Sequence, residues 1–317
     1  MSRIYEALQK AESERKLERN DRDLRTPVEQ LDPLPAPAAV ADYDTAPSYS
    51  EPRLVDGIDE MPSTHTLGGG LNLNAIPHHT WNLSAGRLPS LLERGPAIEQ
   101  FRSLRSRIYE ARDIRPLKSI LVSSGLPQEG KSFISTNLAL SLARHKSSKV
   151  LLIDGDMRRY TIHEMLGTVC HPGLADYLAG KATMEEIMQR SEEPADRHAS
   201  SRIALQNLTF IPGGNGGDKA ADLSSNARFG ELLRTAAPYF DWIIIDSSPV
   251  LPVSDAVNLA RSCDGVLLVA RSGVTKYPVA QRAASELRAS NILGYVLNAV
   301  HEAPQVGNYY GYNANKE

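Results

Sequence analysis

The feature that most restricts the fold is a regular alternation of aliphatic runs and helical stretches, which begins near residue 91. Runs of Ile, Leu and Val are typical of strands buried on both faces, and the segments between them carry apolar residues at helical spacing. We expect strands at 119–123, 150–153, 208–211, 242–245, 265–270 and 292–300, and helices at 131–144, 174–190, 226–237, 254–261 and 276–289. This alternation predicts an α/β fold with a parallel sheet covered by helices on both faces.

The chain before residue 91 has a different composition. Residues 21–90 contain Pro- and Gly-rich stretches such as LDPLPAPAAV and LGGG, and we predict a disordered linker there. Residues 1–20 are highly charged, and their pattern fits either a solvated helix or a short amphipathic helix that docks on a partner. The apolar positions of that pattern are Met1, Ile4, Tyr5, Leu8 and Ala11. We therefore expect a docking helix at 1–20, a folded domain at 91–302 and a flexible tail at 303–317.

Composition and charge exclude several classes of protein. The 317 residues are 41% hydrophobic and 23% charged, which is ordinary for a globular protein, and a net charge of −3 gives no support to a broad nucleic-acid-binding surface. Two cysteines cannot build a disulfide scaffold, and they fit a reducing compartment. We find neither an apolar run long enough to cross a bilayer nor a secretory signal, so we expect a cytoplasmic location.

The strongest chemical signal is the octapeptide GLPQEGKS, which matches the phosphate-loop pattern G-x-x-x-x-G-K-S. It lies between an expected strand and an expected helix, as phosphate binding by backbone N–H groups and a helix N-terminus requires. Lys131 is expected to reach the β- and γ-phosphates of a nucleotide, and the Ser132 hydroxyl to ligate Mg²⁺. The expected nucleotide-binding residues are Gly125, Leu126, Pro127, Gln128, Glu129, Gly130, Lys131, Ser132 and Phe133.

Carboxylates follow two further strands. The segment VLLIDGD places Asp154 and Asp156 after one strand, and WIIIDSSP places Asp246 after another, as in a Walker B element. Taken singly, each is also compatible with a solvated aspartate at a strand end. Because ligands bind outside the carboxyl ends of parallel strands, we expect these three aspartates to surround one phosphate and metal position together with the loop.

The combination of a phosphate loop, an apolar-D-x-D-x-R segment and an apolar-D-x-x-P segment resembles the Walker A, A′ and B motifs of the bacterial tyrosine kinases. These are cytoplasmic autokinases that work with capsule and exopolysaccharide chain-length machinery. The likeness covers about residues 95–312 and extends to PGL at 172–174, LAG at 178–180 and YVLN at 295–298. The opening MSRIYEALQKAE is similar to the start of soluble, exopolysaccharide-linked members.

The resemblance implies an ATP-dependent protein-tyrosine autokinase that regulates capsular or exopolysaccharide biosynthesis, with ATP and Mg²⁺ as cofactors. In this interpretation Lys131 and Asp154 are catalytic, with Asp154 as the base, although the residues leave open which of Asp154 and Asp156 has that role. Ser132 and Asp156 would bind the metal directly and Asp246 through water. Asn298 would contact the adenine, although it could equally be an ordinary loop residue.

The resemblance also assigns residues to assembly and phosphorylation. Glu99, Arg102 and Arg105 are similar to the oligomerisation helix E-x-x-R-x-x-R of the family, although this spacing could instead give ion pairs within one helix. The tail reads NYYGY, and Tyr309, Tyr310 and Tyr312 are the expected phosphoacceptors, unless the tail packs its aromatic rings. The implied partners are a separate membrane chain-length or activator protein, a cognate tyrosine phosphatase and further copies of the chain, at the inner face of the cell membrane.

Two other functions fit parts of the sequence. A dimeric P-loop ATPase switch of the partitioning or division-site type would carry a lysine directly after the first loop glycine, where this chain has Leu126. A nucleotide-binding adaptor of polysaccharide export would need no chemistry, but the loop and its aspartates are intact. The chain departs from the kinase family at 214–219, where GNGGDK replaces an Asn-Pro and a Glu-Leu-Leu run.

Overall fold

The computed structural model describes residues 70–145, 147–192 and 199–300. The expected helix at 1–20, the expected linker up to residue 69 and the tyrosines of the tail lie outside the described residues. None of the helices in the described ranges combines the length and the hydrophobicity that crossing a membrane would require.

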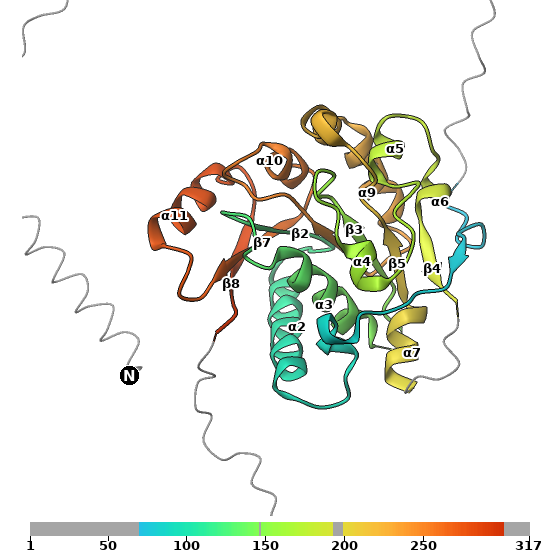
Figure 1. The fold of residues 1–317 in the computed structure, drawn as a ribbon, viewed down its shortest axis with the longest axis horizontal. Coiled ribbons are helices and arrows are strands. Elements are labelled where there is room, and N and C mark those ends of the chain that lie inside the picture. The colour runs from blue at the N-terminus through green and yellow to red at the C-terminus, as the bar shows by residue number, and fades with distance from the viewer. Residues whose placement is uncertain (1–69, 146, 193–198, 301–317) are drawn as a thin grey trace, which may run out of the picture. The chain divides into compact units, whose positions relative to one another are not determined.

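One eight-stranded sheet forms the centre of the described structure, in the order β1-β4-β5-β3-β6-β2-β7-β8 (Figure 1). Among these strands only β4 and β5 pair antiparallel, so the predicted parallel α/β sheet is confirmed. The strands are β1 (His78–His79), β2 (Ser119–Ser124), β3 (Val150–Asp154), β4 (Gln189–Ser191), β5 (Leu208–Ile211), β6 (Trp242–Asp246), β7 (Gly265–Arg271) and β8 (Ile292–Asn298).

Helices cover both faces of the sheet. In Figure 1, α2, α3 and α7 lie against one face, and α5, α9 and α10 against the other. Successive residues of a strand point to opposite faces, so Ile243 and Ile245 of β6 enter one buried cluster while Trp242 and Ile244 enter the other. The α-helices are α2 (Pro96–Ile114), α3 (Lys131–Ala143), α4 (Ile162–Leu166), α5 (Leu174–Leu178), α6 (Met184–Ile187), α7 (Ala199–Gln206), α8 (Ala220–Ser224), α9 (Arg228–Ala236), α10 (Asp255–Ala260) and α11 (Tyr277–Glu286).

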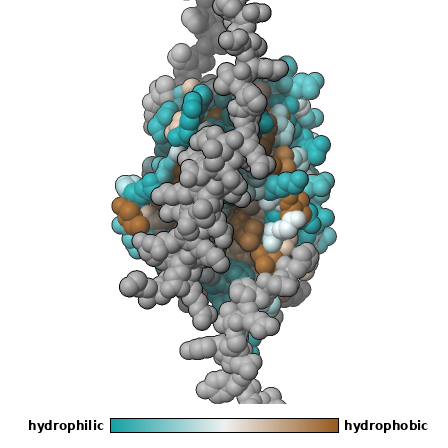
Figure 2. All heavy atoms as spheres, turned by 90° about the vertical axis from the view of Figure 1, so that its left-hand side faces the viewer, coloured by the Kyte–Doolittle hydropathy of each residue, from teal (hydrophilic) through white to brown (hydrophobic). Residues whose placement is uncertain are grey.

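Strand β8 forms one edge of the sheet, next to α11. Several large apolar side chains of this region are exposed, among them Val274, Tyr277, Tyr295 and Leu297. Figure 2 looks onto this side of the molecule and, where grey atoms do not cover it, shows hydrophobic patches among hydrophilic residues. The outer edge of β8 is therefore open in the described part of the chain.

The expected single helix at 174–190 is wrong. The segment forms α5, then α6, and then the short strand β4. Gly180 has a φ of 74°, a left-handed conformation that ends the first helical segment. Thr183 starts the second, because its hydroxyl accepts a hydrogen bond from the Glu186 N–H while the Glu186 carboxylate accepts one from the Thr183 N–H. Apolar periodicity continues across both helices and hides the break.

The expected linker extends too far along the chain, because residues 70–90 pack on the core. Leu71 and Ile76 belong to the cluster on one face, and Trp81 and Leu88 to the cluster on the other. The segment also contains β1 and two 3₁₀-helices, η1 (Ala85–Arg87) and η2 (Pro89–Leu91). Its apolar residues are spaced without helical or strand periodicity, so the composition resembled that of a linker.

We expect Leu88→Ala to lower the free energy of unfolding by about 2–5 kcal/mol, because the Leu88 side chain is 1% exposed within the core. Leu92→Ala is the matched control: Leu92 lies four residues later and is 49% exposed, and its loss should cost roughly 0.5 kcal/mol or less. Urea denaturation of both variants measures the difference. Equal, small losses would contradict the assignment of residues 70–90 to the folded domain.

Candidate functional site

The predicted phosphate loop connects the end of β2 to the start of α3, and α3 begins at Lys131. Gly130 has a φ of 97°, and a Cβ atom at this position would lie 2.0 Å from Nδ2 of Asn298. Glycine is therefore favoured by the backbone conformation, and any other side chain here would have to displace the Asn298 amide. Gln128 also has a positive φ, of 62°. A loop of this shape followed by a helix N-terminus is suited to binding phosphate oxygens.

Buried polar contacts hold the loop in place. The Glu129 carboxylate is buried; its Oε2 accepts a hydrogen bond of 2.8 Å from the Leu126 N–H, and its Oε1 accepts one from the Thr275 hydroxyl. Nδ2 of Asn298 donates to the Glu129 carbonyl oxygen at 3.0 Å. The loop conformation thus depends on residues that lie 146 and 169 positions later in the chain. No motif marks Thr275 in the sequence.

Ser132, at the start of α3, contacts Asp246 at the end of β6. The Ser132 hydroxyl donates a hydrogen bond of 2.5 Å to Oδ2 of Asp246, which is fully buried at the end of β6. Oδ1 of Asp246 has no hydrogen-bond partner among the described residues. In the β3–β6 pairing Asp154 lies opposite Asp246. Ser132, Asp154 and Asp246, all predicted site residues, therefore come together at the carboxyl ends of these strands.

The site is electrostatically strained by its own carboxylates. Burial raises the pKa of Asp246 to about 7, and nearby Asp156 adds to this shift, while Lys131 and the Ser132 hydrogen bond oppose it. Burial, followed by the charge of Asp246, raises the pKa of Asp154 well above its usual range. Ionising adjacent buried carboxyl groups together is unfavourable, and a nearby cation offsets this repulsion. This group of carboxyl groups therefore favours a bound cation.

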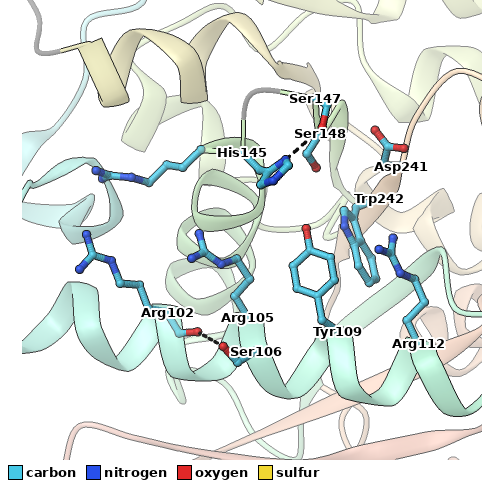
Figure 3. A pocket seen from close by; sticks show the side chains of 11 residues that line it. Arg102, Arg105, Ser106, Tyr109, Arg112, His145, Ser147, Ser148, Asp241 and Trp242 are labelled. Atoms are coloured by element: carbon cyan, nitrogen blue, oxygen red, sulfur yellow. Dashed lines mark hydrogen bonds between the residues drawn. The ribbon is translucent and has the colours of Figure 1, made fainter.

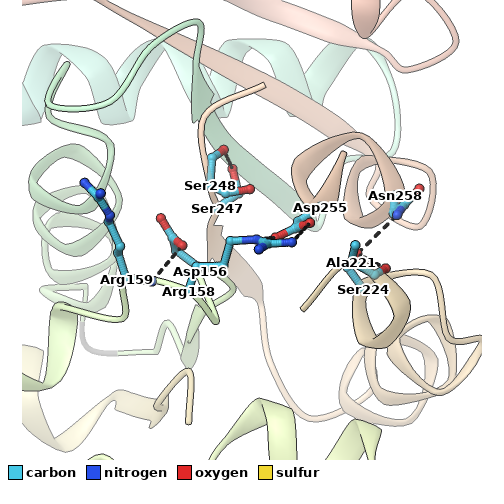
Figure 4. A network of polar contacts seen from close by, with 9 residues as sticks. All are labelled: Asp156, Arg158, Arg159, Ala221, Ser224, Ser247, Ser248, Asp255 and Asn258. Atoms are coloured by element: carbon cyan, nitrogen blue, oxygen red, sulfur yellow. Dashed lines mark hydrogen bonds and ion pairs between the residues drawn. The ribbon is translucent and has the colours of Figure 1, made fainter. Parts of the chain in front are cut away.

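The loop after β3 is fixed by its own hydrogen bonds. Oδ2 of Asp154 accepts from the Ile162 N–H at 3.1 Å, and Oδ1 of Asp156 accepts from the Arg159 N–H at 3.0 Å. Nε of Arg158 donates to Oδ2 of Asp255 at 2.7 Å, which ties this loop to the start of α10 (Figure 4). The pair was not predicted, because Asp255 lies far along the chain in an ordinary helix-start position.

The donor set fits a hard divalent cation held jointly by protein and phosphate. The described residues contain no cluster of three or more His, Cys, Asp or Glu side chains arranged as a metal site. Mg²⁺ is usually bound by one or two carboxylates together with phosphate oxygens and water, rather than by a complete protein cage. The Ser132 hydroxyl and the unpartnered oxygen of Asp246 meet that requirement.

The contacts of α2 are made within the chain. The Arg102 guanidinium forms an ion pair with Glu99, one turn earlier on the same helix. Nη1 of Arg105 donates to the Ser141 carbonyl oxygen near the end of α3, at 2.7 Å. The alternative of ion pairing within one helix is thus realised for Glu99 and Arg102, and a role of the three residues between subunits stays a prediction.

The fold and the loop define a nucleotide-binding protein of the P-loop class. The family described as AAA domain matches residues 128–277. Tyrosine-protein kinase YwqD of Bacillus subtilis is 33% identical over 221 residues, which are 69% of this chain and 87% of that protein. Tyrosine-protein kinase wzc of Salmonella typhimurium is 33% identical over 220 residues, which are 68% of this chain and 28% of that protein.

A solved structure supports the same assignment. The kinase domain of the Escherichia coli tyrosine kinase ETK superposes with a TM-score of 0.62 at 29% identity, over 74% of this chain and 88% of that one. The chain belongs to the family of bacterial tyrosine-protein kinases. The resemblance seen in the motifs is therefore confirmed. The chain corresponds to nearly the whole of YwqD but to just over a quarter of the wzc kinase.

We expect Thr275→Val to weaken nucleotide binding about threefold to tenfold, because it removes one hydroxyl hydrogen bond from the buried Glu129 that shapes the phosphate loop. The same hydroxyl accepts from the Arg271 N–H. Thr275→Ser keeps the hydroxyl and is expected to bind normally. Titration with a fluorescent ADP analogue measures both. Normal binding by the valine variant would show that the loop holds its shape without Thr275.

Proposed function

We propose that this protein is an ATP-dependent protein-tyrosine autokinase. The observation that carries the proposal is the contact between the phosphate-loop motif and Asp246. Oδ2 of Asp246 accepts a hydrogen bond from the Ser132 hydroxyl, and Oδ1 has no hydrogen-bond partner in the described part of the chain. A protein that only bound phosphate would not need a buried carboxylate there, whereas phosphoryl transfer from Mg·ATP does. Membership of the tyrosine-kinase family supports the choice of tyrosine as the acceptor.

The residues of the loop would position ATP for transfer. Lys131 would contact the β- and γ-phosphates, and the backbone from Gly125 to Phe133 would surround them. Ser132, Asp156 and Asp246 would hold Mg²⁺, with Asp246 acting through water. When bound, Mg²⁺ supplies neutralisation of charge on the phosphates. In this structure Asn298 donates to the Glu129 carbonyl oxygen, so its side chain already faces the phosphate loop. We propose that it contacts the adenine from this position.

The base is assigned to Asp154 because its raised pKa brings the carboxylate closer to the basicity that proton abstraction near neutral pH requires. Its two oxygens already accept N–H groups, from Ile162 and, at 3.3 Å, from Asp156. The reverse assignment, with Asp156 as base and Asp154 near the metal, is the competing proposal. A neighbouring lysine and a divalent cation would both favour the ionised form of either carboxylate.

Acceptors and partners complete the proposal. The acceptors would be Tyr309, Tyr310 and Tyr312, presented by a neighbouring subunit in an oligomer joined through Glu99, Arg102 and Arg105. The proposed partners are a separate membrane activator of capsule or exopolysaccharide export and a tyrosine phosphatase that resets the tail. Such a kinase would work in the cytoplasm, recruited to the membrane by that activator. The chain has Leu126 where a partitioning ATPase would need lysine, which supports the kinase over that alternative.

Lys131→Met is expected to lower autophosphorylation about 100-fold or more while leaving the fold intact, because it removes the cation nearest the transferring phosphate. Lys181→Met is the matched control, since Lys181 is an exposed lysine on the turn after α5. Radiolabelled ATP with phosphotyrosine detection measures the activity, and circular dichroism checks the fold. Full labelling by the purified Lys131→Met protein would overturn the role of Lys131, and absence of labelling in the unmutated protein would overturn the kinase assignment and favour an adaptor.

Asp154→Asn and Asp156→Asn are expected to differ in their response to Mg²⁺. If Asp156 is a metal ligand, the Asp156→Asn variant should recover part of the lost activity at high Mg²⁺, because a higher Mg²⁺ concentration offsets the weakened affinity for the metal. Asp154→Asn should not recover, because a missing base is not replaced by metal. Initial rates across a Mg²⁺ series test this. Equal recovery of both variants would remove the separate roles, and recovery of Asp154→Asn alone would reverse them.

Phosphorylation is expected to occur between subunits. An inactive full-length Lys131→Met protein is mixed with active protein truncated after Val306, and the two are separated by size after reaction with radiolabelled ATP. Label should appear on the inactive protein, because only its chain carries the tyrosine tail. If it stays unlabelled while full-length active protein labels itself, each chain phosphorylates its own tail and the proposed exchange between subunits is wrong.

A further inference from the structure

A cavity of about 620 Å³ lies at the opposite end of the sheet from the phosphate loop. It is bounded by α2, by the residues after α3 and by the start of β6 (Figure 3). Strand β6 runs from Trp242 at this cavity to Asp246 at the nucleotide site, a rise of about 13 Å. We call it the arginine pocket, defined by Arg102, Arg105, Tyr109, Arg112, Arg144 and Trp242.

The wall of the arginine pocket carries a strong excess of positive charge. Four arginines and His145 line it, and Asp241 is the one acidic side chain among its described lining residues. Oδ2 of Asp241 already accepts the Lys149 N–H at 2.8 Å. Glu99 pairs with Arg102 but does not line the cavity. The wall is therefore rich in hydrogen-bond donors and poor in acceptors.

Two of the arginines are positioned by hydrogen bonds to backbone carbonyls, and both keep N–H groups that could bind a ligand. Nη1 of Arg105 donates to the Ser141 carbonyl oxygen, and Nη1 of Arg144 donates to the carbonyl oxygens of Ser90 and Leu92, at 2.7 and 2.8 Å. A guanidinium group has five N–H donors in a rigid fork, so both side chains keep free donors. These anchors fix the orientation of the forks before any ligand arrives.

The arginines also crowd one another. Burial lowers the pKa of Arg144, the charges of Arg102 and Arg105 lower it further, and Glu93 opposes these effects. Like charges gathered in one cavity are unfavourable unless an anion compensates them. Structural contacts account for part of this cluster: Arg105 and Arg144 donate to backbone carbonyls and Arg102 pairs with Glu99. They leave Arg112 unexplained.

Arg112 makes this clearest, because no described residue forms an ion pair or a hydrogen bond with it. Its guanidinium carbon lies 4.3 Å from the ring centroid of Trp242 and 4.8 Å from that of Tyr109. The two rings pack edge to face, with centroids 5.3 Å apart. Figure 3 shows the three side chains stacked together at one end of the pocket. The aromatic rings hold a cation in place while leaving its donors available.

We propose that the arginine pocket binds a diphosphate group, either inorganic pyrophosphate or the diphosphate of an ester. Arginine forks match phosphate oxygens in pairs, and arginines approach the cavity from two sides, so two linked phosphates can be bound where one would leave forks unused. The cavity volume lies within the range of small-molecule sites. This ligand is distinct from the ATP proposed for the phosphate loop, and the two sites are tested separately.

Calorimetric titration with sodium pyrophosphate in EDTA tests the pocket, using full-length Lys131→Met protein so that the phosphate loop contributes little. We expect binding that weakens as NaCl increases. Arg112→Gln and Arg144→Gln should each weaken it by about tenfold or more, as the loss of a charge-assisted contact implies. Arg107→Gln is the matched control: Arg107 also lies on α2, is 77% exposed, pairs with Glu110 and does not line the pocket.

Arg112→Lys keeps the cation over the aromatic rings and should bind more tightly than Arg112→Gln, which separates lost charge from a folding defect. Uridine diphosphate is titrated in parallel, and tighter binding than pyrophosphate identifies an ester as the ligand. Absence of pyrophosphate binding, or equal weakening by Arg107→Gln, overturns the proposal. If pyrophosphate does not bind and Arg112→Gln changes only the oligomeric state in sedimentation velocity, the pocket is a subunit interface instead. Each result is independent of kinase activity, because the protein tested is the Lys131→Met variant.

Discussion

The position of β6 between β2 and β3 is the constraint on which the rest of the site depends. Because β6 pairs in parallel with both neighbours, the phosphate loop after β2, Asp154 and Asp156 at and just after the end of β3, and Asp246 all lie at the carboxyl ends of these strands. The hydrogen bond from Ser132 to Asp246 then joins the helix that follows the loop to the strand beside it. Burial of two facing carboxyl groups is unfavourable by itself, and a cation bound there would offset that cost.

Polar contacts over long sequence distances make this site rigid. Thr275 and Asn298 hold the phosphate loop through Glu129, and Arg158 ties the loop after β3 to Asp255. Each contact is partly buried, so it is less exposed to water, which makes a hydrogen bond stronger and an unpaired group more costly. Phosphoryl transfer depends mainly on positioning and charge, so the loops must be held before the nucleotide binds.

The same elements connect the two ends of the sheet. Helix α3 begins with Lys131 in the phosphate loop and ends just before Arg144 in the arginine pocket, and β6 runs from Trp242 to Asp246. Arg105 reaches from α2 to a carbonyl near the end of α3. The α2 segment proposed to join subunits therefore contributes to the arginine pocket and contacts the helix that opens at the nucleotide site.

The sequence by itself determined the parallel α/β class, most strand positions, the phosphate loop and the three aspartates, because apolar periodicity and short motifs are local. The tertiary structure decided the break between α5 and α6, the packing of residues 70–90, the contacts of Glu129 and Arg158, and the arginine pocket. These depend on side chains from distant parts of the chain, such as Arg112 and Trp242, or Leu88 and the core. A local sequence pattern does not predict which distant residues come into contact, because those contacts depend on the order of the strands in the sheet.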